Sequence, residues 1–93
     1  MKIPPKVKIG GHWVTIKFRS DEEDAYSPAG SNRATANLIV LSKTNMETKQ
    51  ESILFHEIIH ELNWQHDLNL TETQISSLGE GIYQVLKDNC WLK

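Results

Sequence analysis

Polar and apolar residues alternate over residues 6–9 and again over residues 12–18, and Gly10 and Gly11 separate the two stretches. Alternation of this kind is typical of a strand with one buried face, and a two-glycine connection is typical of a tight hairpin. Residues 35–41 form a short apolar run rich in β-branched side chains, which predicts a third, more buried strand. The first half of the chain therefore predicts a small antiparallel sheet of about three strands.

The second half of the chain carries two helix-start signals. Thr44 with Glu47 has the form of a capping box and predicts a helix that continues to about residue 64. Thr71 with Gln74 repeats the signal and predicts a second helix that continues to about residue 89. Strands first and two helices after them indicate an α+β fold.

Composition limits the classes of protein to consider. The chain has 93 residues, 39% hydrophobic and 24% charged, which is typical of one globular domain over residues 1–93. The acidic residues 21–24 precede a segment with Pro, Gly and Asn, so we expect a solvated loop there. The net charge of -2 and the scattered basic residues argue against nucleic acid as a partner. The single cysteine, Cys90, and the absence of a long apolar run favour the cytoplasm and argue against a membrane.

Residues 56–60 read His-Glu-Ile-Ile-His, which is the H-E-x-x-H motif within the first predicted helix. The four-residue spacing places His56 and His60 on one face of the helix, where both imidazoles can bind the same cation. Imidazole suits zinc, and a catalytic zinc site takes a third protein ligand and a water molecule. We therefore expect one Zn²⁺ on His56 and His60, with Glu57 as the general base that activates the zinc-bound water.

The helical wheel separates the two histidines from the core side of their helix. They lie roughly opposite the apolar stripe, but Ile53 and Trp64 share their side, so the histidine side is expected to line a cleft or to meet the second helix. The stripe consists of Leu54, Phe55, Ile58, Ile59 and Leu62.

Glu80 is the first candidate for the third zinc ligand. It lies twenty residues after His60 in the second predicted helix and off the main apolar stripe of that helix, which runs through Ile75, Leu78, Ile82, Val85 and Leu86. Gly79 and Gly81 flank it, and glycine inside a helix costs about 1 kcal/mol against alanine. Close approach of the second helix to the histidine face would explain these glycines.

His66 is the alternative third ligand. It has the spacing of the third histidine in the metzincin motif, with Asn63 in place of the glycine that makes the turn. No methionine follows Met46 to supply the later turn of that motif. Asp67 and Glu72 are more remote candidates.

The H-E-x-x-H motif followed by an acid on a second helix resembles the gluzincin zinc metallopeptidases. Because the chain holds only a small sheet and two helices, it is most similar to the minimal zincin-like proteins encoded by phages and prophages, distantly akin to the ImmA/IrrE peptidases. The resemblance rests on the start at Ile9-Gly10-Gly11, the strand around residues 38–41, residues 56–60 and the helix over residues 78–89.

The resemblance implies a metal-dependent peptide-bond hydrolase with a minimal zincin-like catalytic core, located in the host cytoplasm if phage-encoded. It also implies that the strand over residues 35–41 offers its edge to an extended protein or peptide substrate. The residue that would stabilise the oxyanion stays open among His12, Tyr26, His66 and Tyr83.

Two alternatives to a peptidase remain. One is a zinc-stabilised, catalytically silent binding or regulatory module of phage origin. The other is a metal-free interaction domain that uses Trp13, Trp64 and Trp91 as anchors.

Overall fold

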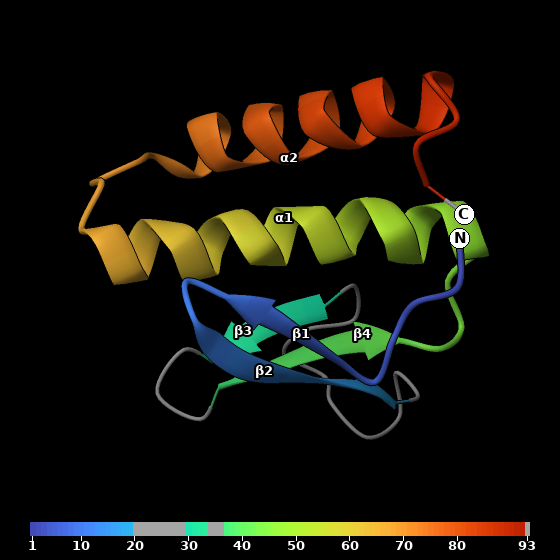
Figure 1. Cartoon of the computed structure of the whole chain (residues 1–93), viewed down its shortest axis with the longest axis horizontal. Helices are drawn as coiled ribbons and strands as arrows, with labels where there is room; N and C mark the ends of the chain where they lie inside the picture. Colours follow the sequence, from blue (N-terminus) through green and yellow to red (C-terminus); the bar gives the residue numbers. More distant parts are fainter. Residues whose placement is uncertain (20–29, 34–36, 93) are drawn as a thin grey trace.

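The computed structural model describes residues 1–19, 30–33 and 37–92, and Figure 1 shows how their strands and helices are arranged. α1 lies between the sheet and α2 (Figure 1). This arrangement confirms the predicted α+β fold. The strands are β1 (Lys6–Ile9), β2 (His12–Arg19), β3 (Gly30–Arg33) and β4 (Leu38–Ser42), and the helices are α1 (Glu47–His66) and α2 (Glu72–Asp88).

The sheet differs from the predicted one in strand number and in one pairing. The four strands have the order β1-β2-β4-β3. β1 and β3 pair antiparallel with their neighbours, but β2 and β4 run parallel. The prediction that all strands pair antiparallel is therefore wrong for β2 and β4, and β3 adds a fourth strand to the predicted set of about three. Parallel neighbours need a long connection, and the segment between β2 and β4 provides it and includes β3.

β4 is an internal strand, which corrects the prediction that its edge receives a substrate. Along its length β4 pairs with β2 on one side and with β3 on the other. β3 occupies the edge beside it, and α1 contacts both strands. Among the described strands, an extended peptide could therefore add next to β3 but not next to β4. The predicted loop at residues 21–24, Tyr26 and the predicted strand start at residues 35–36 lie outside the described residues.

The hairpin between β1 and β2 has the predicted two-residue connection. Gly10 and Gly11 have φ angles of +58° and +82°, a conformation that glycine adopts without a steric penalty. The side-chain amide of Gln65 in α1 donates a hydrogen bond of 3.0 Å to the carbonyl oxygen of Ile9. The hairpin is thereby attached to the last turns of α1.

The hydrophobic core lies between the sheet and α1. Ile58 and Leu62, from the apolar stripe predicted for the first helix, are partly buried against this core. Phe55 packs instead against the ring of Tyr83 in α2, at a centroid distance of 5.6 Å. α1 therefore has apolar contacts on two sides. The buried core residues are Ile9, Val14, Ile16, Ile39, Leu41 and Leu54.

The start of α1 lies beyond the predicted capping box. Met46 occupies the N-cap position and makes no side-chain capping bond. The hydroxyl of Thr44 is instead 2.8 Å from that of Ser42. The side-chain amide of Gln50 donates to the Ser42 carbonyl oxygen at 3.1 Å, so a glutamine on the first turn connects the helix to β4. The helix starts at Glu47, three residues after the predicted cap.

The start of α2 agrees with its prediction. The hydroxyl of Thr71 accepts the Gln74 amide N–H at 3.1 Å, and the Gln74 side chain accepts the Thr71 amide N–H at 2.8 Å. This reciprocal capping box fixes the first turn of the helix, which begins at Glu72. The first residue of α2 is therefore held in a defined position.

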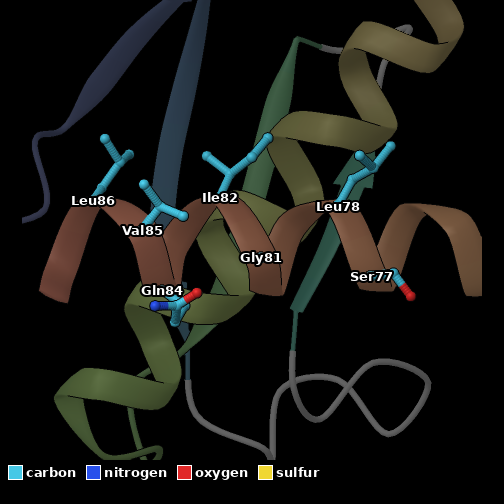
Figure 2. A pocket seen from close by; sticks show the side chains of 7 residues that line it. All are labelled: Ser77, Leu78, Gly81, Ile82, Gln84, Val85 and Leu86. Atoms are coloured by element: carbon cyan, nitrogen blue, oxygen red, sulfur yellow. The ribbon is translucent and has the colours of Figure 1, made fainter.

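The apolar stripe predicted for α2 coincides with the fully buried face of the helix only at Ile75. Ile75, Gly79 and Tyr83 are buried, whereas Leu78, Ile82 and Val85 are more than 40% exposed. These exposed residues line one groove with Ser77 and Gly81, and Figure 2 labels the side chains that line it. Trp13, Trp64 and Trp91 are also more than half exposed. Neither helix in the described parts of the chain has the length and apolar character needed to cross a membrane.

A buried carboxylate connects α1 to α2 at the end remote from the inter-helix turn. The hydroxyl of Tyr83 donates to Glu51 at 2.6 Å, and the Lys87 ammonium lies 3.4 Å from the same oxygen. Burial raises the pKa of Glu51, but the Met1 ammonium, Tyr83 and Lys87 together lower it below the ordinary glutamate value. Tyr83 therefore contributes to the contact between the helices.

Candidate metal centre

His56 and His60 lie one turn apart on the side of α1 that meets α2. Their Nε2 atoms are 3.2 Å apart, and their side chains are 23% and 31% exposed. Both rings thus direct their Nε2 atoms to the same place, where one cation could contact both. This arrangement confirms the sequence expectation that the histidine side meets the second helix.

Glu72 reaches both histidines from the first turn of α2. One carboxylate oxygen lies 2.9 Å from Nε2 of His56, and the other lies 3.1 Å from Nε2 of His60. The Glu72 side chain is 66% exposed, so the centre opens to solvent on this side. Sequence reasoning had ranked Glu72 as a remote candidate, and the structure brings it into contact with both imidazoles.

The turn between the helices determines where Glu72 lies. Asp67 caps α1 with a left-handed backbone, and its N–H donates to the carbonyl oxygen of Asn63. The side-chain oxygen of Asn63 accepts the N–H of Leu70 at 2.9 Å. The chain therefore reverses within a few residues, and α2 begins beside the last turns of α1.

α1 and α2 run antiparallel. Each step of one turn back along α1 meets a step of one turn forward along α2. This register places Glu80 opposite Ser52, whose hydroxyl donates to its carboxylate. Glu80 is therefore one turn away from His56, and the structure does not bring it to the histidines. The matched contacts are His60 with Glu72, His56 with Ser76, and Ser52 with Glu80.

His66 lies on another side of α1. The metzincin spacing requires the helix to end near Asn63, but α1 continues through His66. Six helical residues rotate the chain by about 240° relative to His60. His66 is exposed, and the structure does not group it with the other two histidines.

Gly79 permits the close approach of the two helices at this centre. A Cβ atom at this position would lie 2.9 Å from Cα of His56 and 3.1 Å from its backbone nitrogen. Gly81 differs, because a Cβ atom there would meet nothing within 4 Å. The expectation of close packing is thus confirmed at Gly79 and is wrong at Gly81.

Glu57 completes the group of acid and imidazole side chains. Its ligand atom and those of His56 and His60 lie within 4.8 Å of one another, and Glu57 is only 6% exposed. Burial raises the pKa of Glu57 to about 7, and the negative charge of Glu72 contributes to the rise. Burial also lowers the pKa of His60, although the Glu72 carboxylate acts in the opposite direction. His60 therefore favours the neutral form that binds metals.

The side chains fit the zinc ion that the motif implies. Two imidazoles and a carboxylate are common zinc ligands. Bonds of about 2.0–2.1 Å in a tetrahedral site separate neighbouring ligand atoms by about 3.4 Å. The two Nε2 atoms are 3.2 Å apart, and the two Glu72 oxygens lie 2.9 Å from that of His56 and 3.1 Å from that of His60, which is close to that value.

No family model, curated protein or solved structure matches this chain. The resemblance to gluzincins therefore stays a prediction from the motif.

Proposed function

We propose that this chain is a zinc-dependent peptide-bond hydrolase in which His56, His60 and Glu72 hold the metal. The contact of the Glu72 carboxylate with both imidazoles, beside the buried Glu57, carries the proposal. Glu80, the acid first chosen from the sequence, is hydrogen-bonded to Ser52 and has no comparable support. The substrate class is a protein or peptide, and the reducing cytoplasm is the proposed compartment.

Each residue has a distinct role in the proposed reaction. Zinc at such a site acts as a Lewis acid and lowers the pKa of a water ligand to about 7. Glu57 accepts a proton from the attacking water and passes it to the leaving amine. His56, His60 and Glu72 fix the place where this occurs, next to Glu57. Of the candidates for stabilising the oxyanion, Tyr83 already donates its hydroxyl to Glu51.

A second function is a zinc-stabilised binding module without turnover. It is favoured by one observation: the proposed ligands come from both α1 and α2. A metal bound by them would link the two helices whether or not a reaction follows. This module and the hydrolase predict the same zinc site and differ only in catalysis.

Glu57→Gln separates the two functions. We expect the zinc-loaded wild type to cleave members of a degenerate peptide library, with cleavage followed by mass spectrometry. Glu57→Gln should retain its zinc and lose at least about 100-fold in cleavage rate, the contribution typical of a general base. Glu80→Gln is the matched control and should cleave at the wild-type rate.

Two outcomes of this cleavage experiment would contradict the proposed hydrolase. A zinc-loaded Glu57→Gln protein with full activity would remove Glu57 from the mechanism. A zinc-loaded wild type that cleaves no peptide in the library would favour the binding module.

A further inference from the structure

The two ring nitrogens of His56 face different partners. Nε2 points to the centre, where Glu72 lies at 2.9 Å and His60 at 3.2 Å. Nδ1 lies 3.5 Å from the hydroxyl oxygen of Ser76 in α2. An imidazole that binds a metal through Nε2 carries its proton on Nδ1, and that N–H needs an acceptor. Ser76 is in the position to be this acceptor.

The packing of α2 determines where the Ser76 hydroxyl lies. Ser76 is half-buried and follows Glu72 by one helical turn, so both residues lie on the side of α2 that meets α1. Gly79, on the same side, lies directly against the backbone of His56. A larger residue at that position would separate the helices and move the hydroxyl away from the ring.

We propose that Ser76 is a positioning residue that orients His56 and fixes its tautomer for metal binding through Nε2. The inference rests on the zinc site of the proposed function but does not require peptide-bond hydrolysis. Ser76 does not touch the metal or the substrate in this role. Loss of a hydrogen-bond partner of this kind typically weakens metal affinity by about 10–100-fold.

Ser77 and Ser52 supply matched controls for Ser76. Ser77 is the next residue of the same helix and lines the exposed groove in Figure 2. Ser52 makes a different hydrogen bond between α1 and α2, to Glu80. Ser77→Ala tests the loss of a hydroxyl from α2 itself, and Ser52→Ala tests the loss of a bond between the helices.

The experiment measures zinc affinity by competition with a chromogenic chelator for the full-length wild type, Ser76→Ala, Ser77→Ala and Ser52→Ala. We expect Ser76→Ala to bind zinc about tenfold more weakly or worse. Ser77→Ala and Ser52→Ala should stay within about twofold of the wild type, because neither removes a partner of a ligand. Nitrogen-15 NMR of the zinc-loaded wild type should show His56 bound through Nε2 with its proton on Nδ1.

Three results would overturn the inference. Equal zinc affinities of the wild type and Ser76→Ala would show that the hydroxyl has no effect on the metal. Equal losses in Ser76→Ala and Ser52→Ala would assign the effect to helix packing. A wild type that binds no zinc would overturn both this inference and the proposed metal site. Tight zinc binding without any peptide cleavage would overturn the hydrolase alone, so the two failures are distinguishable.

Discussion

Glu72→Gln is expected to weaken zinc binding by at least about 100-fold, since loss of a partner that only orients a ligand already costs about 10–100-fold. The substitution keeps the shape of the side chain and removes the negative charge that faces both imidazoles. It also removes an acidic residue from the first turn of α2, which costs about 0.3–1 kcal/mol of helix stability. The measurement should therefore be zinc affinity by chelator competition, because thermal stability would combine the two effects.

Glu80→Gln is the control for this prediction. It changes the same chemical group on the same helix, but its carboxylate accepts the Ser52 hydroxyl and does not reach the histidines. Its zinc affinity should equal that of the wild type. If Glu80→Gln lost zinc and Glu72→Gln kept it, the register of the two helices at the centre would be wrong.

Gly79→Ala and Gly81→Ala should change stability in opposite directions. An alanine Cβ at position 79 would lie 2.9 Å from Cα of His56, and backbone atoms cannot move aside as a flexible side chain can. Overpacking of this kind costs about 1–3 kcal/mol in the free energy of unfolding. At position 81 nothing lies within 4 Å, so alanine should stabilise the helix by up to about 1 kcal/mol.

Urea unfolding of the metal-free proteins measures both glycine variants. Gly79→Ala should also weaken zinc binding, because Glu72 and Ser76 approach the histidines from the displaced helix. Gly81→Ala should leave zinc affinity unchanged. Equal stability changes in the two variants would contradict the close contact between α2 and His56.

The helical parts of the candidate site were predictable because helical periodicity depends on local sequence. The spacing of His56 and His60 placed both rings on one face, and the helical wheel indicated that this face lines a cleft or meets the second helix. The capping box of Thr71 and Gln74 correctly gave the start of α2. Each of these signals lies within a single helix.

The third ligand, Glu72, was only a remote candidate in the sequence because its position depends on the register between two helices. The flanking glycines and the position off the apolar stripe favoured Glu80, whereas the structure places Glu72 opposite His60. Equal distances from the inter-helix loop would pair Glu72 with His66, so the observed contact with His60 depends on how the loop folds and not on its length alone. The capping box at Thr71 marks one end of that loop.

The sheet was only partly predictable for a similar reason. β3 reads Gly-Ser-Asn-Arg, which lacks the alternation of a half-buried strand and resembles a loop. Without β3, nothing in the sequence indicated that β4 runs parallel to β2. Likewise, the apolar stripe of α2 predicted its buried face, but close helix packing buries Gly79 and leaves Leu78 exposed.

The most direct test of the central claim is the zinc content of the wild-type protein, purified without chelator and measured by elemental analysis. The geometry of His56, His60 and Glu72 predicts one zinc ion per chain. A chain that contains no zinc, and takes up none on reconstitution, would contradict the metal centre and the hydrolase built on it.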